Sequence, residues 1–191
     1  MSLPAQPTPH VQIHPRDLAL LRSLYESRVR TYRHAAILHF SGRIEATKKR
    51  LARLKQTGYI RERPRHPYEP AVIQLTAQGY RLLRHGDHLD GYPVLSDKAV
   101  ARRSQVSDMT IRHELGVMDA KAALADAIGR EPGLILTRFA TWPRLYEFRA
   151  TLPLPTSDGR TSLHVKPDGF FRVVEDAANA LYEHLFFLEL D

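Results

Sequence analysis

The sequence predicts an α+β protein in two parts, a helical part with a short β-hairpin and then a helix-backed β-sheet part. Helical spacing of apolar residues dominates residues 15–85, whereas several strand-like runs follow a long helical pattern that starts near residue 107. Residues 1–105 hold 19 Lys and Arg against 8 Asp and Glu, a balance of +11, whereas residues 106–191 hold 9 against 13, a balance of −4. A basic part favours nucleic acid as its partner, and a solvated basic surface without a partner is the alternative.

Composition excludes several classes of protein. No apolar run approaches the length of about 18 residues that a membrane span needs, and the first ten residues, MSLPAQPTPH, lack the charged start and apolar stretch of a signal peptide. The chain has no cysteine, which excludes disulfides and cysteine-ligated zinc. We therefore expect residues 1–14 to be a flexible tail, the protein to be cytoplasmic, and no membrane to be among its partners.

Three helices are predicted at the start of the basic part. Pro15 and Asp17 open the first helix, and residues 32–38 form a short second one that ends before Ser41 and Gly42. The third covers residues 43–57, with apolar residues on one face and polar or basic residues at steps of four, three and three on the other. The apolar set is Ile44, Leu51 and Leu54, and the opposite set is Arg43, Thr47, Arg50 and Arg53.

A β-hairpin and a closing helix follow the third helix. Gly58 is a natural residue just after a helix end, residues 59–63 and 71–75 read as strands, and residues 64–70 form the loop between them. A further helix then begins near Thr76. This order, with the strings "ATKKRLARLKQTGYI" and "IQLTAQGYRLL", resembles the winged helix-turn-helix of bacterial regulators.

The resemblance implies a winged-helix DNA-binding domain over residues 15–85, with double-stranded DNA as its partner. In that family the third helix enters the major groove and the wing touches the DNA backbone. By position, the residues expected to face DNA are Arg43, Thr47, Lys48, Lys49, Arg50, Arg53, Arg61, Arg63 and Arg65. The alternative is a winged helix that serves as a protein-interaction module.

The middle of the chain is predicted to be a linker over residues 86–106. Its start is rich in turn residues, and we interpret His85, Asp87, His88 and Asp90 as solvated rather than metal-binding, since their spacing matches no metal site. From residue 107 the pattern predicts one long helix that ends at Gly129 and opens an α/β domain over residues 107–191.

Four strands are expected in this second domain, over residues 134–139, 145–152, 163–174 and 182–191, with a turn at 153–159. "VKPDGFF" then places Asp168 in a strand together with Lys166, and "FFLELD" places Glu189 and Asp191 on one face of the next strand. If these faces coincide, three carboxylates and a lysine converge in the way that would hold Mg²⁺ for phosphodiester cleavage. The alternative is a set of solvated charges near a sheet edge.

This acidic pattern resembles the PD-(D/E)xK core of restriction-endonuclease-like nucleases. Together with the winged-helix start, the strings "HELGVMDA", "KPDGFF" and "FLELD" look like the replication-relaxation family of plasmid and mobile-element proteins. That resemblance implies a bacterial protein of plasmid replication and DNA relaxation. The nuclease pattern implies Asp168, Glu189 and Lys166 as catalytic residues, and Asp168, Glu189 and Asp191 as ligands of Mg²⁺. The motif departs from the nuclease pattern at Asp191, where a lysine is expected. Because Asp191 ends the sequence within a predicted apolar strand, we expect a core that is truncated at its C-terminus.

Three functions remain open at this stage. The first is a DNA-binding replication or mobilisation factor, which would act as a homodimer or with other plasmid replication or mobilisation proteins. The second is an Mg²⁺-dependent nickase or nuclease. The third is a winged-helix transcriptional regulator whose second domain serves as an effector or dimerisation domain.

Overall fold

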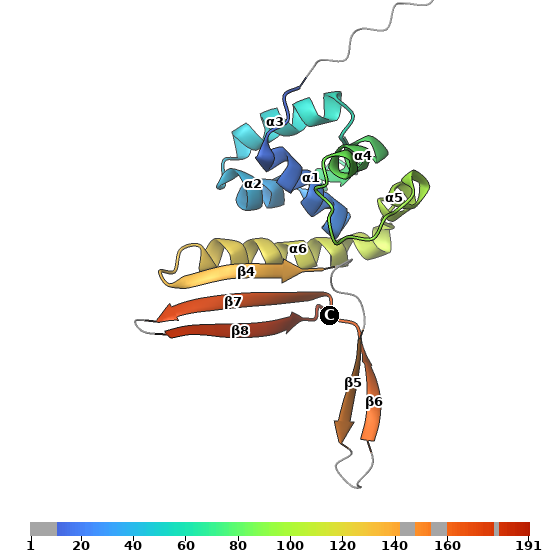
Figure 1. The fold of residues 1–191 in the computed structure, drawn as a ribbon. Coiled ribbons are helices and arrows are strands. Elements are labelled where there is room, and N and C mark those ends of the chain that lie inside the picture. The colour runs from blue at the N-terminus through green and yellow to red at the C-terminus, as the bar shows by residue number, and fades with distance from the viewer. Residues whose placement is uncertain (1–10, 142–147, 154–159, 178–179) are drawn as a thin grey trace, which may run out of the picture. The chain divides into compact units, whose positions relative to one another are not determined.

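The computed structural model describes residues 11–141, 148–153, 160–177 and 180–191, and it shows an α+β chain made of two compact units. Unit 1 covers Met1–Asp126 and unit 2 covers Ala127–Asp191 (Figure 1). The described elements of unit 1 are α1 (Pro15–Ser27), β1 (Arg30–Thr31), α2 (Tyr32–Phe40), α3 (Ile44–Gln56), β2 (Ile60–Glu62), β3 (Val72–Leu75), α4 (Ala77–His85), α5 (Asp97–Arg103) and α6 (Asp108–Ile128), whose last two residues fall in unit 2. Those of unit 2 are β4 (Leu134–Ala140), β5 (Phe148–Pro153), β6 (Arg160–Val165), β7 (Gly169–Ala177) and β8 (Ala180–Leu188).

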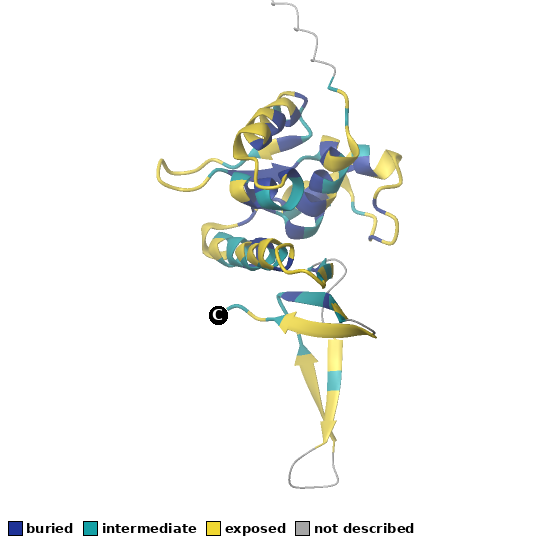
Figure 2. Ribbon diagram, turned by 90° about the vertical axis from the view of Figure 1, so that its left-hand side faces the viewer, coloured by how far each residue is buried: buried dark blue, intermediate teal, exposed yellow. Residues whose placement is uncertain are grey.

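Unit 1 places its helices around a three-stranded antiparallel sheet with the order β1-β3-β2. Leucines of α1, α3 and α4 and the central strand β3 form its core (Leu20, Leu21, Leu24, Leu51, Leu54, Leu83 and Ile73). Figure 2 shows many buried residues in the helices of this unit. The predicted helices near residues 15, 32–38, 43–57 and 76 all form, and each described end lies within about two residues of its prediction. The two-residue strand β1 was not predicted, because its single partner lies more than 40 positions away.

Gly79 holds the first turn of α4 close to the α3–β2 connection. Thr76 caps α4 by accepting a hydrogen bond from the Gly79 amide (3.1 Å), and its hydroxyl donates to the carbonyl of Gly58 (2.6 Å). A Cβ atom at position 79 would lie 2.2 Å from the carbonyl oxygen of Tyr59. Because backbone cannot yield as a flexible side chain can, this position accepts only glycine.

Replacing Gly79 with alanine is therefore expected to lower the free energy of unfolding by about 1–3 kcal/mol, because the added methyl group forces α4 away from Tyr59. Gly86→Ala is the matched control just after the same helix, since a Cβ there meets only the imidazole end of the exposed His88. Urea unfolding of the two variants should separate them clearly. Equal stability of Gly79→Ala and Gly86→Ala would contradict this account of the α4 start.

The segment 86–106 is not the solvated linker that the sequence predicts, because it packs within unit 1 and contains α5. Leu89, Val100 and Val106 are buried, and the Tyr25 hydroxyl donates to the carbonyl of Pro93 (2.9 Å). Tyr92 joins a ring cluster with Tyr25, their centroids 5.7 Å apart in an edge-on arrangement. The buried residues of this segment are too widely spaced for a periodic pattern, which explains why the sequence indicated a loop. Helix α6, expected to open the second domain, belongs to unit 1 as far as Asp126.

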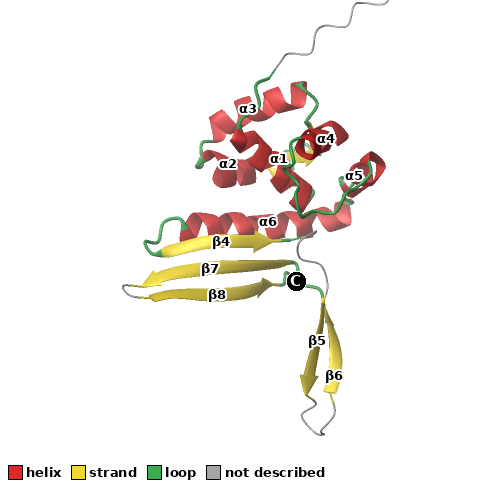
Figure 3. Cartoon of the chain, in the orientation of Figure 1, coloured by secondary structure: helices red, strands yellow, loops and turns green. Residues whose placement is uncertain are grey.

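Unit 2 contains antiparallel β-structure in two sheets, β4-β7-β8 and the hairpin β5-β6, as the yellow strands of Figure 3 show. Phe171 of β7 stacks on Phe139 of β4 and on Phe186 of β8, with ring centroids 5.9 and 4.7 Å apart. The predicted strand at 163–174 is wrong as one element, because β6 ends at Val165 and β7 begins at Gly169. Three predictions lie partly outside the described residues: the turn at 153–159 from residue 154 onward, the strand at 145–152 up to residue 147, and the tail at 1–14 up to residue 10. Pro153 is the last residue of β5.

Candidate nucleic-acid interface

Helix α3 has a buried face and an exposed basic face. The buried stripe runs at helical spacing through Thr47, Arg50, Leu51 and Leu54. Arg43 at the N-cap, and Lys48, Lys49 and Arg53 in the helix, are exposed on the other side. Two small exposed residues, Ala46 and Ala52, separate these cations. Because the alanine side chains are short, a negatively charged partner can approach the backbone of α3 closely while the longer Lys and Arg side chains contact it.

Arg50 does not lie on the exposed face, although the sequence groups it with the DNA-facing residues. Its guanidinium donates two hydrogen bonds to the carboxylate of Asp17, one of them 2.8 Å from Nε to Oδ1, and a third to the carbonyl of Gln12 (2.6 Å). Asp17 is fully buried and Arg50 is 9% exposed. The pair joins α3 to the start of α1, so Arg50 positions the helix and has no surface to offer to DNA.

Thr47 is buried as well, and its hydroxyl donates to the carbonyl of Arg43 within α3 (2.8 Å). Among the exposed cations, Lys48 pairs with Glu45 one turn earlier (2.7 Å). Lys49 and Arg53 form no ion pair with any residue that the structure describes. These two side chains, with Arg43, therefore hold the charges on α3 that remain available for phosphate.

The hairpin β2–β3 carries the three predicted wing arginines in three different settings. Arg61 is exposed and its Nε donates to the side-chain carbonyl of Gln74 (3.1 Å). Arg63 forms a close ion pair with Asp108, the first residue of α6. Arg65 lies 3.7 Å from a carboxylate oxygen of Glu62, and its Nη1 donates to the carbonyl of Glu69 (2.7 Å). Arg61 and Arg65 stay exposed, whereas Arg63 mainly ties the hairpin to α6.

The hairpin is fixed beside α3 by a small polar network centred on Glu62. Lys55 near the end of α3 donates to Glu62 Oε2 (2.6 Å), and the hydroxyl of Tyr32 donates to the same oxygen (3.0 Å). The hydrogen bond from Lys55 lowers the pKa of Glu62, and the same bond raises the pKa of Lys55. Both groups are therefore charged at neutral pH, and the ammonium of Lys55 is occupied by a carboxylate rather than free for phosphate.

The predicted acidic site is not assembled in the way the sequence suggested. Asp168 lies in the bend before β7, where its carboxylate accepts a hydrogen bond from the amide of Leu190 (2.9 Å). Lys166 is exposed in the same connection, and Glu189 and Asp191 are exposed beyond the end of β8. None of the four lies in a strand, because the Pro-Asp-Gly run makes a turn and β8 stops at Leu188.

In the part of the chain that the structure describes, which includes all three acids, no group of three or more His, Asp or Glu could hold a metal ion. The observed role of Asp168 is to fasten the end of the chain to the start of β7, since its amide also donates to the carbonyl of Leu188 (3.0 Å). Among the helices that the structure describes, none combines the length and the hydrophobicity of a membrane-spanning segment.

A comparison with protein families matches residues 21–191 to the family Replication-relaxation. The match extends over most of both units, from α1 to the last residue. The chain belongs to the Replication-relaxation family. Searches among curated proteins and among solved structures found no match. Membership confirms the resemblance to this family that was carried by the winged-helix start and the "HELGVMDA", "KPDGFF" and "FLELD" strings.

Two features of this Replication-relaxation protein were not predicted from its sequence. One is the carboxylate of Asp17 that holds Arg50, and the other is the loop residue Tyr68, whose side chain is 99% exposed. A short loop between two strands gave no signal for the second. Asp17 lies in the first turn of α1, where an aspartate is already favoured by the helix dipole. The sequence therefore gave no sign that this aspartate pairs with Arg50.

Proposed function

We propose that this protein binds double-stranded DNA through the exposed face of α3 and acts as a DNA-binding factor in the replication of a plasmid or mobile element. The order of elements supports a winged helix-turn-helix: α1, α2 and α3 precede an antiparallel hairpin, and α4 closes the unit. Membership of the Replication-relaxation family supports the biological setting.

The observation that carries the proposal is the exposure of Lys49 and Arg53 without ion-pair partners in the described chain, on a helix whose other face is buried. A cation that already pairs with a carboxylate gains little from phosphate, whereas an unpaired one displaces counterions from DNA. Arg43, exposed at the N-cap, adds a third cation at the start of the same helix. Contacts of this kind position a protein on DNA, and they are expected to be mainly to phosphates.

The test measures binding of the full chain to a fluorescently labelled duplex by anisotropy. The Lys49→Gln/Arg53→Gln variant should bind at least about 10-fold more weakly, because it loses two charge-assisted phosphate contacts. The matched control, Lys98→Gln/Arg102→Gln, removes two exposed charges from α5 and should bind within about twofold of the unchanged protein. If both variants bound alike, or if the unchanged protein showed no affinity for duplex, the proposal would be wrong.

A further inference from the structure

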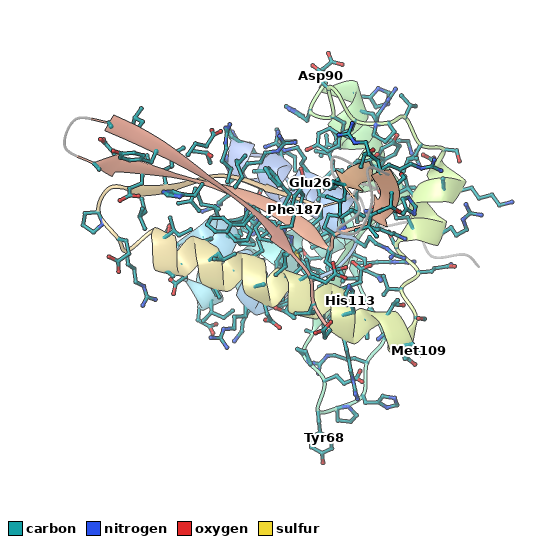
Figure 4. All side chains as sticks on the ribbon, turned by 90° about the horizontal axis from the view of Figure 1, so that it is seen from below. Glu26, Tyr68, Asp90, Met109, His113 and Phe187 are labelled. Atoms are coloured by element: carbon teal, nitrogen blue, oxygen red, sulfur yellow. The ribbon has the colours of Figure 1, made fainter. Side chains whose placement is uncertain are left out.

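A groove of about 750 Å³ separates the β2–β3 loop from the first turns of α6, and both of its walls belong to unit 1. The loop contributes Arg65, His66 and Tyr68, and α6 contributes Met109, Arg112 and Leu115. Figure 4 shows Tyr68 at the outer end of its loop, with Met109 at the start of α6. The lining of this groove combines aromatic, thioether and guanidinium groups, and none of the residues that carry them belongs to α3.

Tyr68 is held outward by a braced turn. Pro67 and Tyr68 are the central residues of a tight turn closed by a hydrogen bond from the Glu69 amide to the carbonyl of His66 (3.1 Å). Arg65 fastens this turn by donating to the carbonyl of Glu69 (2.7 Å), and the His66 amide donates to the Glu69 carboxylate (3.2 Å). Pro67 reduces the freedom of the loop, so the backbone that carries the phenol ring is restricted, while the ring itself is 99% exposed.

The groove is lined by acidic and basic side chains, and one of its cations has no partner among the described residues. The carboxylate of Asp108 is neutralised by Arg63, and that of Glu69 accepts the His66 amide. Arg112 is exposed and makes no ion pair or hydrogen bond with the residues that the structure describes. Arg112 thus offers a guanidinium group from the α6 wall, whereas Arg65 on the loop wall is already held by Glu62 and by the carbonyl of Glu69.

The floor between these walls is apolar. Val72, Ile111 and Leu115 belong to one packed cluster at this site. The exposed thioether of Met109, at 92% exposure, stands over one wall opposite the Tyr68 loop. A flat ring and an apolar surface next to an available cation suit nucleotides whose bases are unstacked, since the bases contact the apolar surfaces and a phosphate pairs with the cation.

We propose that this groove binds an unpaired DNA strand next to the duplex held by α3, with a base stacked on Tyr68 and a backbone phosphate paired with Arg112. A paired duplex hides its base faces in the stack, so it cannot use the Tyr68 ring, whereas a single strand can. The inference rests on the proposed duplex binding, and it adds that the protein distinguishes a fork or opened duplex from a closed one.

The test compares the affinity of the full chain for a blunt duplex, for the same duplex with a short oligo(dT) tail, and for oligo(dT) alone. The unchanged protein should bind the tailed duplex about 10-fold more tightly than the blunt one, as one stacked base contributes a gain of that order. Tyr68→Ala and Arg112→Gln should each remove most of this preference and leave blunt-duplex affinity unchanged. Tyr68→Phe should keep the preference, and Arg102→Gln on α5 serves as the charge control.

The outcomes separate this inference from the proposed function. Equal affinity for tailed and blunt duplex, or a preference that survives Tyr68→Ala, overturns the inference while duplex binding through α3 stands. Binding of oligo(dT) that depends on Tyr68, without any binding of duplex, supports the groove and overturns the function of α3. A groove that captures only a peptide or protein shows no dependence on the tail and overturns the inference in the same way.

Discussion

Replacing Arg50 with methionine is expected to lower the free energy of unfolding by about 3–5 kcal/mol, although Arg50 lies on the helix proposed to bind DNA. The substitution leaves the fully buried carboxylate of Asp17 without its partner, and an unpaired buried charge is among the most costly changes in a protein. Urea unfolding monitored by circular dichroism measures the loss. We expect any effect of Arg50→Met on DNA affinity to follow from this loss of stability.

Two further variants make the expectation for Arg50 specific. Lys49→Met removes the neighbouring charge, which is exposed and unpaired within the described chain, and should change stability by less than about 0.5 kcal/mol. Asp17→Leu combined with Arg50→Met removes both buried charges and should recover most of the stability, because paired apolar replacements are often tolerated. A single Arg50→Met variant as stable as the unchanged protein would contradict the structural role given to this pair.

Mild acid should destabilise the protein through His39, which lies near the end of α2. Burial lowers its pKa to about 3, with Arg30, Lys121, Arg16 and Arg22 acting in the same direction as nearby positive charges. The unfolded chain takes up a proton near its ordinary pKa of about 6.5, whereas the folded chain keeps the imidazole neutral until much lower pH. The stability that depends on neutral His39 is therefore complete above pH 6.5 and is lost progressively as the pH falls towards 3.

At pH 5 the loss from His39 should be about 2 kcal/mol relative to pH 7. The measurement is the difference in unfolding free energy between the unchanged protein and His39→Gln at several pH values, since other titrating groups then largely cancel. His34, whose pKa burial also lowers, remains in both proteins and does not affect the difference. A difference that stays constant from pH 7 to pH 5 would show that His39 is not kept neutral by the fold.

The order α1, α2, α3, β2, β3 and α4 could be predicted because each of these elements carries a local signal, whereas β1 and α5 were not predicted. The end of α3 before Gly58, the two strands of the hairpin and the start of α4 after Thr76 are each indicated by neighbouring residues alone. The direction in which Arg50 points could not be predicted in this way. Two of the four buried positions on α3 are polar, so the apolar period is weak, and the partner that draws Arg50 inward lies 33 residues earlier in the chain.

The acidic residues of unit 2 show the opposite difficulty. The strings around Asp168 and Glu189, together with the winged-helix start and "HELGVMDA", indicated the family, which the comparison confirms. Their geometry was not predictable, because it depends on where β6 ends and β7 begins, and the turn signal of Pro167-Asp168-Gly169 competes with the strand signal on both sides. The motifs therefore indicated the correct family, whereas they did not predict the relative positions of the carboxylates.

The salt dependence of duplex binding tests the central claim, that α3 holds DNA through its unpaired cations, more directly than affinity at one condition. Each phosphate contact to duplex DNA adds about 0.9 to the steepness with which the logarithm of the binding constant falls against the logarithm of salt concentration. The Lys49→Gln/Arg53→Gln variant should therefore show a slope shallower by about 2 than the unchanged protein, while Lys98→Gln/Arg102→Gln keeps the original slope. Equal slopes for the unchanged protein and the α3 variant would contradict the account.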